Sequence, residues 1–308
     1  MEGKRVTVVG ASGTLGGDIV KALLDRGAQV RVMVRATSNR TRLEALGVTD
    51  FLVADLNDPA SLRQALAVQP RADAVIASAA GFTAHSAKTK ADNSRTDTEG
   101  YRNLIDATKG AGIPRFILIS ILGCDRAPGV PHFSQKFEAE TYLAQTGQPY
   151  LALRAGAFLD RARDIVPANL AKGVFPDILP DVPMALVYSR DLARYAAQAA
   201  LDLPDTALNQ SVDIGGDVPA TGAMVAEAFT RVLGRPIVAK PVFSPLIFAL
   251  APLLALFQPR LRDNLAVMTW LRKGGYVSQD PLKQKALFGE LPTVDEAVAR
   301  YVRDKGLA

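Results

Sequence analysis

Short apolar runs alternate with amphipathic segments through the first half of the chain. Strand-like runs lie at Val6–Val9, Val30–Val34, Asp50–Val53, Ala74–Ile76 and Phe116–Ser120. Between them, helical patterns cover Leu15–Arg26, Thr41–Leu46, Pro59–Leu66 and Thr96–Gly110. The strand runs are continuously apolar, which is typical of a parallel sheet covered by helices on both faces. This order of elements predicts an α/β fold with a doubly wound parallel sheet.

The pattern changes after Arg154. Before it, a helix is expected at Gln135–Thr146 and a sixth strand at Tyr150–Leu153; after it, prolines become frequent. A helix is predicted at Ser189–Leu203 and a strand at Ser211–Ile214, and the rest is mostly helical in pattern. We therefore expect a Rossmann domain at 1–155 and a smaller, mostly helical C-terminal substrate region at 156–308. The helix and strand at about 185–214 are expected to interleave that region with the sheet.

A glycine-rich turn, Gly10-Ala11-Ser12-Gly13-Thr14-Leu15-Gly16, joins the first strand to the first helix. Glycines let the backbone approach a phosphate, and the helix N-terminus offers N–H groups and a partial positive charge to an anion. Strand, turn, helix and strand in this order predict a dinucleotide site. The residues expected to hold the pyrophosphate are Gly10, Ser12, Gly13, Thr14, Leu15 and Gly16.

The end of the second strand bears on which dinucleotide is bound. Sites that prefer NAD usually place an acidic residue there, for the ribose hydroxyls. This chain has Arg35, 19 residues beyond Gly16, and its guanidinium suits a 2′-phosphate. Ser38 and Arg40 add hydrogen-bond donors, so the sequence favours NADP(H) as cofactor. The alternative is that Arg35 is a solvated strand end.

Two further strand ends are candidates for cofactor contacts. Asp55 follows the third strand and either accepts from the adenine amino group, with Leu56 near the ring, or caps the next turn. After the fourth strand come only small residues, which let the backbone run close to the cofactor. We expect contacts there from Ser78, Ala79 and Ala80.

Composition excludes several classes of protein. The 308 residues allow one or two domains, with 48% hydrophobic residues and 22% charged residues. The net charge of +5 is modest and no Lys/Arg cluster suggests a nucleic-acid site. Cys124 is the only cysteine, and His85 and His132 are the only histidines, so neither a disulfide nor a metal site is expected.

Localisation and assembly are less constrained. The N-terminus passes straight into the first strand without a signal-peptide pattern, which predicts a cytoplasmic protein. The most apolar stretch, Pro245–Phe257, is 13 residues long and too short to span a bilayer. It is expected to be a buried or pocket-lining helix; a peripheral membrane contact or an apolar dimer face are the alternatives. Monomer and homodimer both stay open.

Several motifs together resemble the short-chain dehydrogenase/reductase superfamily, in particular its atypical NmrA-like members. The similarity covers roughly residues 5 to 215. It rests on the spacing Gly10-x-x-Gly13-x-x-Gly16, on Asp55-Leu56, Gly100-x-x-Asn103-Leu104-Ile105-x-Ala107 and Phe116–Ser120, and on Lys136-x-x-x-Glu140-x-x-Leu143 and Leu153-Arg154-x-Gly156-x-Phe158.

The resemblance implies catalytic residues, but one differs. Typical members use a Tyr-x-x-x-Lys pair and an upstream serine; Lys136 and Ser120 match the lysine and the serine, whereas His132 stands where the tyrosine would be. Lys136 or His132 could supply the acid, as a lysine is thought to do in isoflavone-reductase-like relatives. Alternatively, a quinone acceptor needs no strong acid, or the protein only senses NADP(H). Structurally, Lys136 could be solvated or pair with Glu140, and His132 could be a surface residue.

We therefore expect an NADPH-dependent oxidoreductase acting on a small apolar or aromatic carbonyl, enoyl or quinone compound. The alternative is a non-enzymatic redox sensor or regulatory or assembly protein of the NmrA type. A nucleotide-sugar epimerase is less favoured because the Tyr–Lys couple is missing. The residues that could line an apolar pocket, or belong to the core, are Phe158, Leu159, Val174, Phe175, Ile178, Leu179 and the run Leu246–Phe257.

Overall fold

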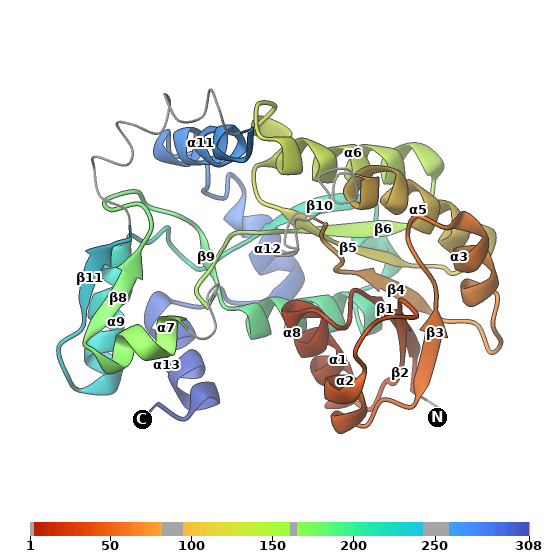
Figure 1. Cartoon of the computed structure of the whole chain (residues 1–308), viewed down its shortest axis with the longest axis horizontal. Helices are drawn as coiled ribbons and strands as arrows, with labels where there is room; N and C mark the ends of the chain where they lie inside the picture. The colour runs from red at the N-terminus through yellow and green to blue at the C-terminus, as the bar shows by residue number, and fades with distance from the viewer. Residues whose placement is uncertain (1–2, 82–94, 161–164, 243–258, 308) are drawn as a thin grey trace. The chain divides into compact units, whose positions relative to one another are not determined.

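A computed structural model describes residues 3–81, 95–160, 165–242 and 259–307. The chain forms two compact units (Figure 1). Unit 1 contains Met1–Ile121, Ser134–Arg154 and Arg190–Val212, and unit 2 contains Leu122–Phe133, Ala155–Ser189 and Asp213–Ala308. The chain therefore passes between the units several times. The predicted domain boundary at residue 155 stays a prediction.

Unit 1 is built on a seven-stranded sheet with the order β10-β6-β5-β4-β1-β2-β3. The pairs β1–β2, β1–β4, β2–β3 and β4–β5 are parallel. The order reverses between β1 and β4, which is where open α/β sheets bind their ligands. The strands are β1 (Arg5–Val9), β2 (Gln29–Val34), β3 (Asp50–Val53), β4 (Ala74–Ala77), β5 (Phe116–Ile121), β6 (Tyr150–Ala155) and β10 (Gln210–Ile214).

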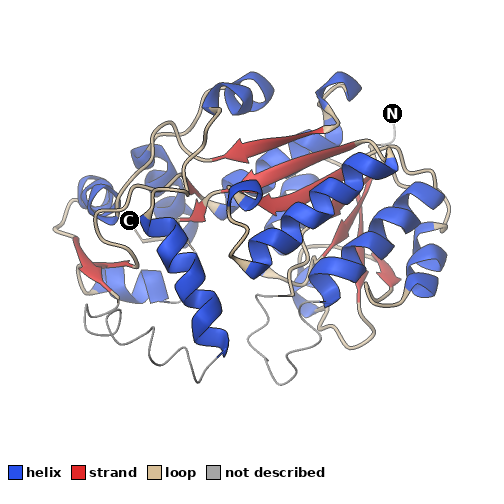
Figure 2. Cartoon of the chain, turned by 90° about the horizontal axis from the view of Figure 1, so that it is seen from above, coloured by secondary structure: helices blue, strands red, loops and turns tan. Residues whose placement is uncertain are grey.

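Helices pack on this sheet (Figure 2), and the central strands β1 and β4 are almost continuously buried, as the apolar runs predict. One core layer joins Val75 and Phe116 on the sheet to Leu104 and Leu143 on the helices. The predicted doubly wound Rossmann-type fold is confirmed. Its helices are α1 (Thr14–Leu24), α2 (Thr41–Ala45), α3 (Pro59–Leu66), η1 (Thr96–Gly100, π-helical), α5 (Tyr101–Gly110), α6 (Pro131–Thr146) and α8 (Ser189–Leu201), with the 3₁₀ turn η3 (Asp205–Ala207). The 3₁₀ turn η2 (Cys124–Arg126) belongs to unit 2.

Unit 2 is mostly helical, as predicted. Its core packs Tyr188, Phe229 and Tyr301 against the helices around them, and Leu159 is buried in the same core. Two short strand pairs, β7–β9 and β8–β11, add parallel ladders that the sequence pattern does not reveal. The elements are β7 (Ala157–Phe158), α7 (Ile165–Ala171), β8 (Val174–Asp177), β9 (Leu186–Val187), α9 (Gly222–Leu233), β11 (Val238–Pro241), α11 (Pro259–Arg272), α12 (Pro281–Phe288) and α13 (Val294–Lys305).

One helix boundary differs in a way that affects the candidate site. The helix predicted at 135–146 begins at Pro131, so His132 lies in its first turn and not in a loop. Proline suits this position because its fixed φ is already helical and its missing N–H would have no partner there. The predictions made for Pro245–Phe257 and His85 fall outside the described residues. Within the described part of the chain, no helix has the length and apolar character needed to cross a membrane.

Candidate functional site

The predicted cofactor residues follow the carboxyl ends of adjacent parallel strands in unit 1. The glycine turn follows β1, Arg35 follows β2, Asp55 lies just past β3, and Ser78 follows β4. The carboxyl ends of parallel strands meet at one edge of a sheet. The fold therefore collects these residues at the edge where α/β proteins bind dinucleotides.

The glycine turn needs its glycines for contact and conformation. Gly10 has φ +84°, and a Cβ there would lie 2.6 Å from the backbone nitrogen of Ala79. A Cβ on Gly16 would lie 2.2 Å from the carbonyl oxygen of Gly10. Gly13 is the N-cap of α1 without a side-chain capping hydrogen bond, and the first turn carries no acidic residue. The backbone of the turn is thus close-packed at the N-terminus of α1, and a helix N-terminus suits an anion.

Ala79 connects the glycine turn to a buried cation. Its nitrogen lies against Gly10, and its carbonyl oxygen accepts hydrogen bonds from Lys136 Nζ at 3.2 Å and from the Tyr101 hydroxyl. The preceding residue, Ser78, donates from both its N–H and its hydroxyl to the carbonyl of Val9, each at 2.9 Å. The chain just past β4 is therefore fixed on both sides.

Lys136 comes from α6 and is only 2% exposed. Its ammonium nitrogen lies 3.9 Å from the ring centroid of Tyr101, within cation–π range. Burial, and then the nearby Asp97 carboxylate, raise the pKa of Tyr101 well above its usual value. Tyr101 therefore stays neutral and keeps donating to Ala79. Asp97 itself accepts the N–H of Gly81 at 3.0 Å, which holds the end of this segment.

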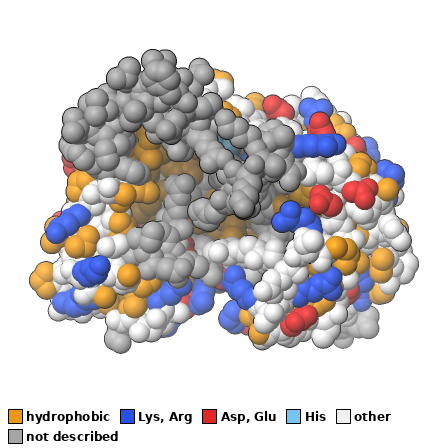
Figure 3. All heavy atoms as spheres, in the orientation of Figure 1, with side chains coloured by type: hydrophobic (Ala, Val, Ile, Leu, Met, Phe, Trp, Pro, Cys, Tyr) orange, Lys and Arg blue, Asp and Glu red, His pale blue; other side chains and the backbone are white. Residues whose placement is uncertain are grey.

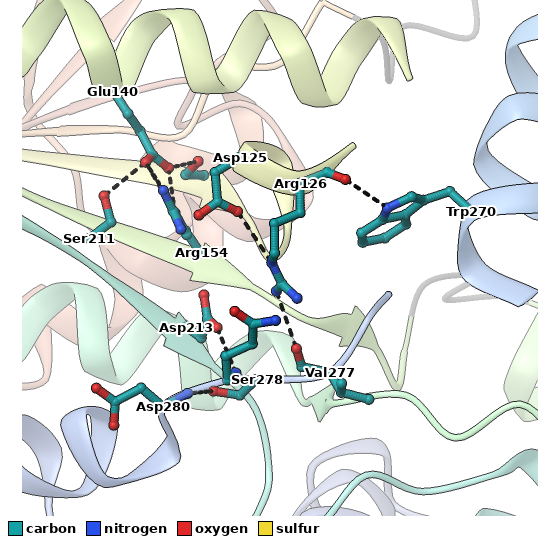
Figure 4. Close-up of polar contacts among 12 residues, drawn as sticks. Asp125, Arg126, Glu140, Arg154, Ser211, Asp213, Trp270, Val277, Ser278 and Asp280 are labelled. Carbon is teal, nitrogen blue, oxygen red and sulfur yellow. Dashed lines mark hydrogen bonds and ion pairs between the residues drawn. The ribbon is translucent and has the colours of Figure 1, made fainter. Parts of the chain in front are cut away.

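Ser120, near the end of β5, belongs to a buried polar network around Glu140, whose contacts with Arg154 and Ser211 are drawn in Figure 4. Its hydroxyl donates to Glu140, and the same carboxylate accepts from Arg154 at 2.7 Å and from Ser211 at 2.8 Å. Ser120 and Glu140 are 2% and 3% exposed. Glu140 is thus held by Arg154, which belongs to a family motif but has no role assigned from the sequence. The carboxylate fixes α6 one helical turn after Lys136.

The predicted 2′-phosphate residues lie at the surface. Arg35 is exposed, and its N–H donates to the Ser38 hydroxyl at 3.1 Å in the tight turn after β2. The Arg40 guanidinium lies 5.1 Å from the centroid of the Phe51 ring. Figure 3 shows Lys and Arg side chains around α1 and α2 in this part of unit 1. Arg42 of α2 adds to them and lies 3.7 Å from Asp18 of α1.

The two residues predicted for the adenine have structural contacts of their own. Asp55 accepts the N–H of Asn57 at 2.8 Å, which is the turn-capping alternative. Asp58 then caps α3, accepting from Ala60 and Ser61. Leu56 is buried in the core of unit 1, and its carbonyl accepts from Asn103 at 3.0 Å. Adenine contacts by Asp55 and Leu56 stay predictions.

His132 has a different environment from Lys136. It belongs to unit 2, is partly exposed, and its ring lies 4.9 Å from that of Phe133 in an edge-to-face arrangement. Within unit 1, the structure brings the glycine turn, Ala79, Tyr101 and Lys136 together. The sequence pattern does not single out Tyr101, and its place one residue after the motif glycine Gly100 is the only local signal for it.

The family model described as the NmrA-like family matches residues 2–255 of the chain. Among curated proteins, the chain is 32% identical to the photosystem II assembly factor Ycf39 of Synechocystis sp. over 197 residues. That match covers 63% of this chain and 58% of the relative, so the chain spans just over half of that protein's length. Quinone oxidoreductase 2 of Escherichia coli is 28% identical over 233 residues, 75% of each chain.

Solved structures give a similar result. The NADPH-dependent quinone oxidoreductase QOR2 from Escherichia coli, complexed with NADPH, superposes with a TM-score of 0.70. It is 25% identical, and the superposition covers 96% of this chain and 99% of that one. The fold similarity therefore extends beyond the sheet into the C-terminal elements.

Proposed function

Because the chain belongs to the NmrA-like family, we propose that it is an NADPH-dependent reductase of a small apolar or aromatic acceptor, with a quinone as the leading class. The similarity to an NADPH-dependent quinone oxidoreductase over nearly the whole chain supports this proposal. We also propose that Arg35, Ser38 and Arg40 favour NADP(H) over NAD(H).

The contacts of Ala79 carry the proposal. One face of this residue packs on Gly10 of the turn, and its carbonyl holds Lys136 and Tyr101. The buried Lys136 side chain thus contacts Ala79, and Ala79 in turn contacts Gly10 of the turn that is proposed to bind the pyrophosphate. A buried ammonium is costly unless it is partnered, and such groups are concentrated at functional sites.

The residues present fit a dinucleotide. Any side chain larger than hydrogen at Gly10 or Gly16 would fill the cradle and collide with backbone. The α1 N-terminus would hold the pyrophosphate, and Arg35 the 2′-phosphate. When bound, NADPH supplies a hydride, and a quinone that gains this hydride and one proton becomes a hydroquinone.

We propose that Lys136 assists the delivery of the proton in that reaction. Its Nζ donates to the carbonyl of Ala79 and lies 3.9 Å from the centroid of the Tyr101 ring, which places it beside the segment that follows β4. A lysine placed there is suited to contact a cofactor ribose or an acceptor oxygen. Ser120 and His132 stay predicted catalytic residues; the Ser120 hydroxyl is directed to Glu140 in this structure.

Steady-state oxidation of NADPH across a panel of quinones and enones tests the proposal. We expect turnover with at least one quinone and a loss of about 100-fold in kcat/KM for Lys136→Met. Lys109→Met, which changes an exposed lysine on α5, is the matched control and keeps full activity. Tight NADPH binding without turnover of any acceptor would overturn the reductase. Full activity in Lys136→Met would instead remove only the role of Lys136.

The second candidate is an NADP(H)-binding assembly or sensing protein. It is favoured by the 32% identity to an assembly factor, which exceeds the 28% identity to the quinone oxidoreductase. Both candidates share the glycine turn. They differ in the fate of the bound cofactor: the reductase consumes NADPH, whereas the assembly protein binds it without net oxidation.

A further inference from the structure

Unit 2 contains two aromatic clusters that differ in exposure. In the first, Tyr301 packs edge-to-face on Tyr188 and Phe229 at 5.8 and 5.7 Å, and all three are at most 1% exposed. This cluster is core. In the second, the ring of Phe133 lies 5.1 Å from Trp270 and 6.0 Å from Tyr276, and Trp270 lies 5.9 Å from Tyr276.

The second cluster differs from the first in how far its residues are buried. Phe133 is buried, but Trp270 and Tyr276 are both partly exposed. All three residues of the first cluster are buried, so exposure separates the two clusters. Aromatic side chains are common in the lining of small-molecule sites.

The indole of Trp270 is held in a fixed orientation. Its Nε1–H donates to the carbonyl of Arg126 at 3.2 Å, and Arg126 in turn donates to the carbonyl of Val277 at 3.3 Å (Figure 4). Glycines flank the ring: a Cβ on Gly123 or on Gly275 would come within 2.5 Å of it. Backbone of the loop after β5 and of the segment after α11 thus lies against the indole.

We propose that the Phe133–Trp270–Tyr276 cluster is a binding surface for a planar, electron-poor aromatic ring, of the quinone class. An indole is electron-rich and stacks on such a ring, and the preset orientation removes the cost of ordering it on binding. Phe133 lies on α6, three residues before Lys136 in sequence. The choice of a quinone rests on the proposed function; the aromatic surface itself does not.

Fluorescence provides a direct test because Trp270 is the only tryptophan of the chain. Anthraquinone-2-sulfonate is titrated into the full-length protein without NADPH, so that binding is measured apart from turnover. We expect saturable quenching of the Trp270 emission. N-acetyltryptophanamide, titrated in parallel, gives the linear collisional and inner-filter quenching to subtract, and cyclohexanesulfonate controls for the anionic group.

Two variants define the surface. Gly275→Ala places a methyl group 2.5 Å from the Trp270 ring, which must move. The affinity for the probe should fall by about tenfold, and the emission maximum should shift. Gly129→Ala, in the loop after β5, is the matched control: it has an ordinary φ and a Cβ there meets nothing within 4 Å, so the affinity for the probe should stay within about twofold. If Gly275→Ala does not fold, Tyr276→Leu replaces it, with a loss of about fivefold expected.

The outcomes separate this inference from the proposed function. Purely linear quenching, or unchanged affinity in Gly275→Ala and Tyr276→Leu, overturns the aromatic site even where quinones are turned over. Saturable binding of the probe in a protein that oxidises no NADPH with any quinone would support the aromatic site and contradict the proposed reductase activity. In an active enzyme, Trp270→Leu should raise KM for the quinone about fivefold and leave KM for NADPH unchanged.

Discussion

The strand-end edge of unit 1 and the aromatic cluster of unit 2 present different chemical groups to a ligand. The first presents backbone: glycines without Cβ atoms, the N-terminus of α1 and the carbonyl of Ala79, with buried charges behind them. The second presents aromatic side chains, with glycine backbone lying against the Trp270 indole. Backbone dipoles suit the constant phosphate groups of a cofactor, whereas rings suit an apolar acceptor. The comparison predicts that the two surfaces can be disabled separately.

The largest expected effect concerns the buried charges of unit 1. Arg154 is the charged partner of Glu140, and the two side chains are only 14% and 4% exposed. Arg154→Met removes the ion-pair partner of a buried carboxylate and should lower the free energy of unfolding by about 3 kcal/mol. Urea unfolding followed by circular dichroism measures it. Glu140→Gln combined with Arg154→Met should recover much of the loss, because the isolated charge is gone.

An ion pair in unit 2 gives the matched control. Arg231 and Asp295 pair at 2.7 Å but are 56% and 48% exposed. Arg231→Met should leave the urea midpoint unchanged within error, since exposed pairs contribute little after solvent screening. Equal losses in Arg154→Met and Arg231→Met would mean that the buried network of unit 1 has no special weight. Such a result would contradict the proposed difference between the buried charges of unit 1 and the exposed charges of unit 2.

The next effect concerns the cradle itself. Gly16→Ala places a Cβ 2.2 Å from the carbonyl oxygen of Gly10 and must displace the turn. We expect the NADPH dissociation constant to rise by roughly 100-fold, because the backbone N–H groups of the displaced turn would no longer point toward the phosphates. Isothermal titration calorimetry measures it. Binding of anthraquinone-2-sulfonate at Trp270 should stay unchanged.

Gly110→Ala is the control for Gly16→Ala. A Cβ there meets nothing within 4 Å and the residue ends α5, so cofactor affinity should be kept. If Gly16→Ala weakens NADPH and the quinone probe equally, the two surfaces are not independent. If it weakens neither, the glycine turn does not bind the cofactor.

How far the sequence predicts these two regions depends on how each is built. The glycine turn lies within seven consecutive residues, so local spacing is enough to identify it. The strands of unit 1 are also local signals, because each is a continuous apolar run. Lys136 is identified only through the family pattern. Its contacts with Ala79 and Tyr101 join three separate elements, and no local pattern predicts them.

The aromatic cluster leaves no comparable signal. Trp270 and Arg126 are 144 residues apart and meet only through the fold. Nothing in the periodicity of Pro259–Arg272 distinguishes Trp270 from any other partly buried helix residue. The predicted start of α6 at Gln135 is wrong: the helix begins at Pro131, and proline is favourable at a first helical position. Sites made of distant side chains need the structure.

The smallest expected effect tests which part of the cofactor unit 1 recognises. Arg35 is exposed at the end of β2, so its hydrogen bonds to a 2′-phosphate are screened by water. Arg35→Asp should weaken NADPH by roughly tenfold and leave NADH nearly unchanged, because only NADPH carries the phosphate. Competitive titrations with both nucleotides measure the ratio, and Arg63→Asp, on α3, is a control for the change of net charge. An equal loss of affinity for NADPH and NADH would contradict the proposal that Arg35 binds the 2′-phosphate. If the Trp270 probe weakened as well, a long-range field would connect the two regions, and the contrast between a backbone-built and a ring-built surface would no longer describe two independent sites.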